Sequence, residues 1–166
     1  MDCAAKNPTL FKPHDLLLQI NACRDAGKRF IVCNLGLYWR THLEIGHANA
    51  LIIDLKYDII ERYDPFASQI NRMTQVDENL ELLLRKHLAP FLYVGTRMMV
   101  PKIAIQEVAD SYNGLCVTFS FAYVLMRLLN PDFSPAQIQE FMMDRSPAQI
   151  RTLMQRLNAF MVELAY

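Results

Sequence analysis

The chain has 166 residues, of which 52% are hydrophobic and 20% are charged, a composition typical of a globular domain. The length suits one domain with a full hydrophobic core, so we expect a single domain over residues 1–166. Seventeen Lys and Arg balance seventeen Asp and Glu, which argues against nucleic-acid binding driven by bulk charge. No apolar run is long enough to span a bilayer, and the first residues lack the pattern of a secretory signal, so we expect an intracellular protein.

The first half of the chain predicts one helix and three strands. Apolar residues recur at helical spacing over residues 15–26, and Gly27 then ends that helix. β-Branched and aromatic residues over 30–39 predict a strand. Two further strands, over 47–53 and 57–63, are joined by a tight loop and therefore form an antiparallel hairpin.

The second half of the chain predicts mostly helices. A helix over 76–88 precedes a short strand over 91–94. Residues 115–129 are apolar almost all round, which predicts a helix that protein surrounds on every face, with Leu125 in its buried middle. Two amphipathic helices follow, each begun by an N-cap serine and a first-turn proline: Ser134-Pro135 and Ser146-Pro147. This order of elements predicts an α+β domain with an antiparallel hairpin at its centre.

The predicted hairpin brings a histidine beside an aspartate. In a register centred on the loop residues 55–56, His47 lies directly opposite Asp64. Residues opposite each other have Cβ atoms about 4.5–5.5 Å apart, close enough for a carboxylate to accept a hydrogen bond from an imidazole N–H. The same register sets Asn49 opposite Arg62, which we interpret as structural support. A bulge or a longer loop would shift this register, so the pairing depends on the turn.

A cysteine completes the set of groups needed for nucleophilic catalysis. Cys116 follows a turn at Gly114 and lies within a residue or so of the start of the apolar helix. There the helix dipole favours the thiolate, and the first N–H groups of the helix can form an oxyanion hole. A thiolate beside an imidazole that a carboxylate orients is the activated nucleophile of cysteine hydrolases. The sequence therefore predicts a triad of Cys116, His47 and Asp64.

Each of these residues also has an ordinary structural interpretation. Taken alone, Cys116 would be a core residue, His47 a strand residue and Asp64 part of an Asp-Pro turn. Cys23 and Cys33 fit small buried hydrophobic residues. The cysteines form no CxxC pair and the other histidines have no ligand spacing, so we expect neither a metal nor a cofactor.

Two blocks of the sequence resemble a known family. Residues 46–54 (GHANALIID) with 61–65 (ERYDP), and 113–116 (NGLC) before an apolar helix ending in RLLNPD, resemble the SUMO-protease and adenovirus-protease superfamily of cysteine peptidases. The pattern is most similar to a divergent branch found in large DNA viruses, and the resemblance covers about residues 28–132. It implies a papain-like α+β fold, in which an antiparallel-centred sheet packs against a buried Cys-bearing helix with additional helices.

The resemblance also implies a function and a location. It predicts a thiol endopeptidase that cleaves a viral precursor or a conjugate of a ubiquitin-like protein at a Gly-rich site, in the host cytoplasm or nucleus or in the virion. The family has an oxyanion-hole glutamine a few residues before the cysteine, where this chain has Asp110. We favour Gln106 for this role, because an ionised carboxylate at Asp110 would repel an oxyanion.

The alternative is a catalytically inactive relative. The chain is short for this family, Ala48 follows His47 where many SUMO proteases have Trp, and the oxyanion glutamine is displaced. These departures favour a structural or interaction module, for example a virion component, in which the catalytic geometry is lost. The two interpretations differ in one distance, since a peptidase needs the Cys116 sulfur within about 4 Å of a His47 nitrogen.

Overall fold

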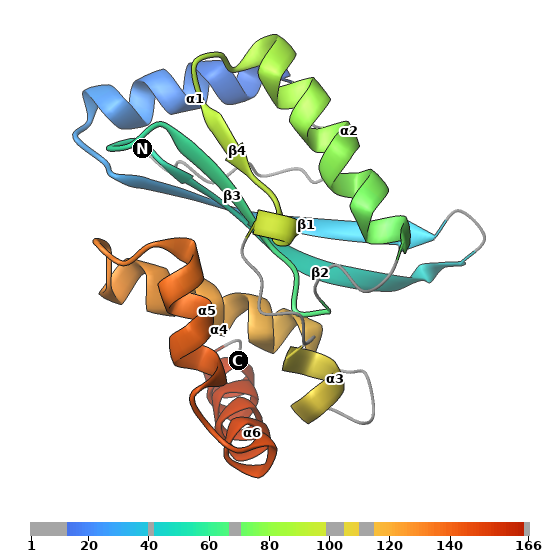
Figure 1. Cartoon of the computed structure of the whole chain (residues 1–166). Helices are drawn as coiled ribbons and strands as arrows, with labels where there is room; N and C mark the ends of the chain where they lie inside the picture. The colour runs from blue at the N-terminus through green and yellow to red at the C-terminus, as the bar shows by residue number, and fades with distance from the viewer. Residues whose placement is uncertain (1–12, 40–41, 67–70, 99–104, 110–114, 165–166) are drawn as a thin grey trace.

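A four-stranded sheet forms the middle layer of the protein, with helices on both of its faces (Figure 1). The structure is a computed structural model, and it describes residues 13–39, 42–66, 71–98, 105–109 and 115–164. The strands lie side by side in chain order: β1 (Phe30–Trp39), β2 (His42–Asp54), β3 (Ile59–Tyr63) and β4 (Leu92–Val94). The first three pair antiparallel and β4 joins β3 in parallel, so the predicted α+β class with an antiparallel-centred sheet is confirmed.

The helices divide between the two faces of the sheet (Figure 1). One face carries α1 (Pro13–Asp25) and α2 (Asn71–His87). The other carries α4 (Cys116–Leu129), with α3 (Ile105–Ala109), α5 (Pro135–Met143) and α6 (Pro147–Leu164) beside or beneath it, while a 3-10 turn, η2 (Thr96–Met98), follows β4.

Alternation along β2 gives the protein two hydrophobic cores. Leu51 and Ile53 pack under α1 and α2, whereas Ala50 and Ile52 pack against α4. The second of these cores contains a stacked pair of tyrosine rings, Tyr63 from β3 and Tyr123 from α4, with centroids 4.1 Å apart. The centre of the sheet is therefore buried on both faces and holds α4 in a fixed position on it.

The register of the β2–β3 hairpin differs from the predicted one by two residues. Asp54 pairs with Ile59 and Leu51 pairs with Arg62, so the loop spans residues 55–58 and is longer than predicted. The Asp54 carboxylate accepts a hydrogen bond from the Lys56 N–H at 2.9 Å, and Asp58 has a left-handed φ of 53°, which together accommodate the two extra residues. The predicted direct opposition of Asn49 and Arg62 is therefore wrong, but an even shift keeps every side chain on its predicted face, and Arg62 Nη1 still donates to Asn49 Oδ1.

The prediction that α4 is surrounded by protein on every face is wrong. Its apolar residues Phe119 and Tyr123 are fully buried, but Leu125 is 38% exposed. The sheet, α5 and α6 cover α4 on part of its circumference only, and the uncovered part carries a row of apolar side chains at helical spacing: Val117, Phe121, Leu125 and Leu128. The predicted starts of α5 and α6 are confirmed, because both begin with a serine whose hydroxyl accepts from the third backbone N–H of the helix.

Candidate active site

A histidine and an aspartate meet at the end of the β2–β3 hairpin. His47 lies on β2 and Asp64 directly follows β3, and both are buried. The imidazole Nε2 lies 2.6 Å from Asp64 Oδ1. Continuing the observed register by one residue sets Asn49 opposite Asp64, so His47 reaches the carboxylate diagonally. Diagonal neighbours on the same face of two paired strands are about 7–8 Å apart, a distance that an aromatic side chain can span.

The Asp64 carboxylate is held by hydrogen bonds to both of its oxygens. Oδ1 accepts from the Phe66 N–H at 2.9 Å as well as from His47, and Oδ2 accepts from Arg62 Nη1 at 3.2 Å. The Phe66 ring also packs against the imidazole, with ring centroids 4.8 Å apart. Both partners of the histidine–aspartate contact are therefore fixed in orientation.

Cys116 is the first residue of α4, and its side chain points into this pair. It forms a hydrogen bond with His47 and accepts from the backbone N–H groups of Ala48 and Val117. Because His47 Nε2 is bonded to Asp64, Nδ1 is the ring nitrogen left for the sulfur. The structure thus brings Cys116, His47 and Asp64 together in one continuous set of hydrogen bonds.

The same contacts favour a charged pair of cysteine and histidine. Burial alone would lower the pKa of His47, but its hydrogen bonds to Asp64 and Cys116 and their charges raise this pKa to about 9. The hydrogen bond from His47 outweighs burial at Cys116 and lowers the pKa of its thiol below the usual range. At Cys33 burial is the cause that dominates, and it raises the pKa of the thiol. The directions at His47 and Cys116 favour the charged form of both side chains over the forms that an isolated thiol and an isolated imidazole would take.

Polar contacts anchor α4 to the sheet at both of its ends. Near its start, Ser120 Oγ donates to the Ala48 carbonyl at 3.1 Å. Near its end, Arg127 Nε donates to the buried Glu61 carboxylate of β3 at 2.7 Å, and Arg127 Nη1 donates to the Phe133 carbonyl at 2.9 Å. The RLLNPD segment, which the resemblance picked out, therefore serves in this structure to hold the cysteine-bearing helix on the sheet.

A buried charge network beside Asp64 was missed by sequence reasoning. Arg62 is fully buried and donates from Nε to Asp77 on α2 at 2.8 Å. The Tyr93 hydroxyl of β4 also donates to this carboxylate, at 2.6 Å, and Thr96 donates to it from both its hydroxyl and its N–H. The charged residues Glu61 and Arg62 inside the short strand β3 were the available signal, because a charge in a buried strand needs a partner.

The structure places Gln106 near this site without testing its predicted role. Its side chain is fully buried on α3, and its backbone N–H donates to the Pro65 carbonyl at 3.1 Å. This bond ties α3 to the residue that follows Asp64. Asp110, the other candidate for the oxyanion hole, lies outside the described residues.

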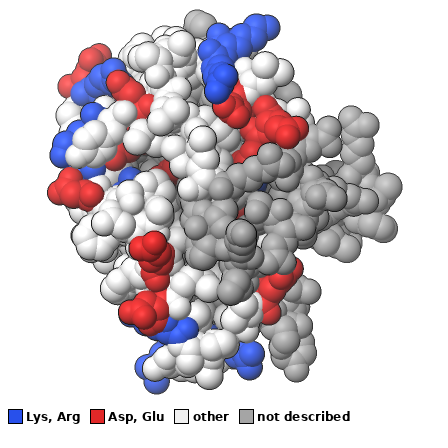
Figure 2. All heavy atoms as spheres, viewed as in Figure 1, with Lys and Arg blue, Asp and Glu red and all other residues white. Residues whose placement is uncertain are grey.

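Charge is distributed evenly over the surface visible in Figure 2, and the described residues hold no metal-binding cluster. Acidic and basic side chains are interspersed on the face shown in Figure 2, consistent with the balanced charge of the chain. Within the described ranges, no three His, Cys, Asp or Glu side chains gather in a way that could hold a metal ion. None of the helices in those ranges has the length and apolarity needed to cross a membrane.

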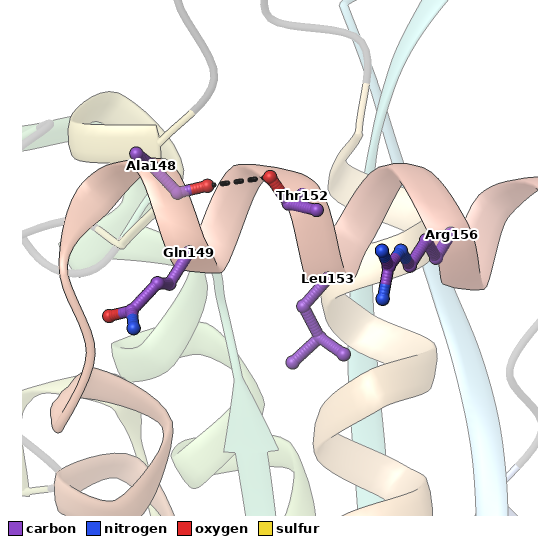
Figure 3. Close-up of a pocket in the computed structure, with 5 residues that line it drawn as sticks. All are labelled: Ala148, Gln149, Thr152, Leu153 and Arg156. Carbon is purple, nitrogen blue, oxygen red and sulfur yellow. Dashed lines mark hydrogen bonds between the residues drawn. The ribbon is translucent and has the colours of Figure 1, made fainter.

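A shallow hollow on α6 has the character of ordinary helix surface (Figure 3). All five lining residues come from this one helix: Ala148, Gln149, Thr152, Leu153 and Arg156. The Thr152 hydroxyl donates to the Ala148 carbonyl at 3.0 Å, so it is engaged within the helix. This hollow includes none of the residues that the sequence predicts as catalytic.

No family model matches the chain, and no curated protein matches it in sequence. Among solved structures it is similar to ChlaDub1 from Chlamydia trachomatis, with 12% identity and a TM-score of 0.45 over 92% of this chain and 58% of that chain. A structure of the C. trachomatis effector protein ChlaDUB1 gives 10% identity and a TM-score of 0.46, over 92% of this chain and 52% of that chain. The C. trachomatis effector protein Cdu1 bound to ubiquitin gives the same identity and TM-score, over 92% and 57%. The chain therefore spans 52–58% of the length of these solved chains.

Proposed function

We propose that this protein is a cysteine peptidase in which Cys116 is the nucleophile, His47 the general acid and base, and Asp64 the group that orients His47. The observation that carries the proposal is the set of hydrogen bonds from Asp64 through His47 to Cys116 at the start of α4. Nucleophile, base and orienting carboxylate come from three separate elements, and each is within hydrogen-bond reach of the next. This arrangement supports catalysis better than the ordinary structural interpretation of each residue alone.

In the proposed reaction, one nitrogen of His47 carries the proton. The Cys116 thiolate attacks the carbonyl carbon of the scissile peptide bond, and the His47 imidazolium donates its Nδ1 proton to the departing amine. A thioester on Cys116 and a neutral imidazole remain. Nδ1 then takes a proton from water, whose oxygen attacks the thioester, and the acid product leaves as the thiolate returns. The bond from Nε2 to Asp64 ensures that Nδ1 is the nitrogen that exchanges the proton.

Backbone groups at the start of α4 supply a site for the oxyanion. The Val117 N–H already donates to the sulfur of Cys116, so it lies beside the atom that attacks. The positive end of the helix dipole adds to this stabilisation of negative charge. We further propose Gln106 as a side-chain donor to the oxyanion, because α3 is tied to the residue that follows Asp64.

For the substrate we propose a protein, either a viral precursor or a conjugate of a ubiquitin-like protein, cleaved after small residues. This choice rests on the sequence resemblance of the histidine, aspartate and cysteine blocks. It leaves two substrate classes that differ in size, because a ubiquitin-like partner needs a folded docking surface and a precursor needs only an extended segment.

An interaction module is a second candidate, and one observation favours it. The apolar row on α4 begins with Val117, next to Cys116, and includes Phe121 and Leu125 on the same uncovered face. Exposed apolar patches of this kind mark protein–protein contacts more often than chance. Such a module would keep the fold of a peptidase without its turnover.

Two electrophilic probes test the proposal. One is a ubiquitin-like protein with an electrophile at its C-terminus, and the other is a short peptide ending in glycine with the same electrophile. We expect a covalent adduct on Cys116 in the wild type and in Cys33→Ala, and none in Cys116→Ala. An adduct with the folded probe alone supports conjugate cleavage, and one with the peptide alone supports precursor cleavage. A folded wild-type protein that forms no adduct with either probe would overturn the peptidase and leave the interaction module.

A further inference from the structure

A second buried carboxylate, that of Asp77, binds the same guanidinium as Asp64. Arg62 donates from Nη1 to Asp64 Oδ2 at 3.2 Å and from Nε to Asp77 Oδ1 at 2.8 Å. The side chains of Arg62 and Asp64 have no exposed surface, and that of Asp77 is 9% exposed. Buried charges interact strongly because little water screens them. Removing the charge of one of these three side chains therefore changes the electrostatic energy of the other two.

The position of Asp77 is fixed by the residues around it. Tyr93 donates to one carboxylate oxygen, and Thr96 donates to the other at 2.5 Å from its hydroxyl and at 3.2 Å from its N–H. Gly95 leaves the space that the carboxylate fills, because a Cβ at that position would lie 2.8 Å from Asp77 Cγ. Although burial opposes ionisation, the hydrogen bonds from Arg62, Thr96 and Tyr93 hold the pKa of Asp77 below its ordinary value. Asp77 is therefore a carboxylate anion that points at Arg62.

The balance of charge shows what Asp77 does for the site. Arg62 touches two carboxylates but carries only one positive charge. If Asp77 neutralises that charge, the negative charge of Asp64 remains available to stabilise an imidazolium at His47. If Asp77 were absent, Arg62 would neutralise Asp64 instead, and the imidazolium would lose its counter-ion.

We propose that Asp77 is a positioning residue of this site, which neutralises Arg62 so that the charge of Asp64 serves His47 and thereby maintains the Cys116 thiolate. This inference rests on the proposed peptidase function and concerns the same site. Among the described residues, the titratable and charged groups whose charges act on one another here are His47 on β2, Arg62 and Tyr63 on β3, Asp64 after β3, Cys116 on α4, Asp77 on α2 and Tyr93 on β4.

The test measures the thiolate directly and needs no substrate. The rate of Cys116 alkylation by iodoacetamide is followed over a pH series by mass spectrometry, in the wild type and in Asp77→Asn. We expect the midpoint of this pH profile to rise by about one unit in Asp77→Asn, because Arg62 then neutralises Asp64 and His47 loses its counter-ion. An opposite charge within about 4–6 Å shifts the pKa of an ionisable group by about 1–3 units. Tyr93→Phe is the matched control, because it removes a hydrogen bond to the same carboxylate and leaves the charge, so its midpoint should equal that of the wild type.

The outcomes separate this inference from the function on which it rests. A wild-type midpoint equal to that of an ordinary thiol would overturn the proposed peptidase. A depressed wild-type midpoint that Asp77→Asn leaves unchanged would overturn the role of Asp77 alone, as would an equal rise in Tyr93→Phe.

A double variant keeps the test available if Asp77→Asn does not fold. Replacing Arg62 by Met and Asp77 by Leu removes one positive and one negative charge together, a change that buried ion pairs often tolerate. The charge of Asp64 then still serves His47, so the alkylation midpoint should stay within about half a unit of the wild type, well below the effect of a full neighbouring charge. A rise of about one unit or more in this double variant would contradict the charge-balance account.

Discussion

His47 and Asp64 meet diagonally across the β2–β3 hairpin, with the imidazole Nε2 2.6 Å from the carboxylate Oδ1. The two residues are not directly opposite each other in the hairpin register. The contact depends instead on the length of the histidine side chain and on the Phe66 ring, which packs against the imidazole. The contact also leaves Nδ1 for Cys116, so one hydrogen bond fixes the tautomer on which the proposed chemistry relies.

Substitution of Asp64 tests this relationship. Asp64→Asn should retain the fold but lose control of the His47 tautomer, because an amide accepts from the ring less well and can also donate to it. Where a triad aspartate is replaced in this way, turnover falls by about 10⁴-fold, and we expect a loss of several orders of magnitude here. The measurement is the rate of adduct formation with the probe that labels the wild type.

Asp58→Asn is the control for that experiment. Asp58 is the exposed partner of Arg24 in the hairpin loop, so this variant should label at the wild-type rate. An Asp64→Asn variant that also labels at the wild-type rate would show that another group orients His47.

Substitutions of two α4 residues test which face of the cysteine-bearing helix is packed against the rest of the protein. Phe119 is fully buried between the sheet and the other helices, so Phe119→Ala should destabilise the protein by about 3–5 kcal/mol. Leu125 is on the uncovered face and 38% exposed, so Leu125→Ala should cost less than about 1 kcal/mol. Chemical denaturation of both variants measures the two free energies of unfolding. Equal losses would mean that the uncovered face of α4 is buried in solution, as in a complex between copies.

The stability contributed by the His47–Asp64 pair should depend on pH. The comparison uses the Cys116→Ala background, because the thiol of Cys116 titrates together with His47. In this background the hydrogen bond to Asp64 and the charge of Asp64 still act to raise the pKa of His47 above its ordinary value of 6.5, so the contribution of the pair is fully present below pH 6.5. The contribution is then lost as the pH rises through the raised pKa of the folded state.

The measurement is the free energy of unfolding of Cys116→Ala with and without His47→Gln. The difference between the two proteins should be largest in mild acid and should shrink as the pH becomes alkaline. A difference that grows with pH would mean that the folded protein prefers the neutral imidazole, contrary to the contact with Asp64.

The sequence predicted those features of the fold and of the site that depend on residues close together in the chain. Period-two alternation and the N-cap serines predicted the order of elements, and the start of an apolar helix at Cys116 predicted one of the three residues that the site brings together; the predicted turn at Gly114 lies outside the described residues. The register was not predictable in this way, because it depends on how Asp54 and Asp58 shape a four-residue loop. Sequence reasoning brought His47 and Asp64 into contact from an incorrect register, since a shift by two residues keeps the same face.

Features that depend on distant segments could not be found from one sequence. Asp77 lies on α2, 15 residues from Arg62 in the chain, and nothing in a helical carboxylate indicates a buried guanidinium. The apolar circumference of α4 predicted burial on all sides, yet covering it needs more neighbouring elements than the described part of the chain places there. Composition reports how apolar a helix is, and only the tertiary arrangement decides which side is covered.

Activation of Cys116 by His47 is the central step of the proposed function, and one measurement tests it directly. The rate of alkylation by iodoacetamide at neutral pH is measured at Cys116 in the wild type and in His47→Ala, with an unstructured cysteine peptide as the reference thiol. We expect wild-type Cys116 to react faster than the reference thiol, and His47→Ala to reduce its rate to that of the reference or below. Wild-type Cys116 that reacts no faster than it does in His47→Ala would contradict the proposed catalytic pair.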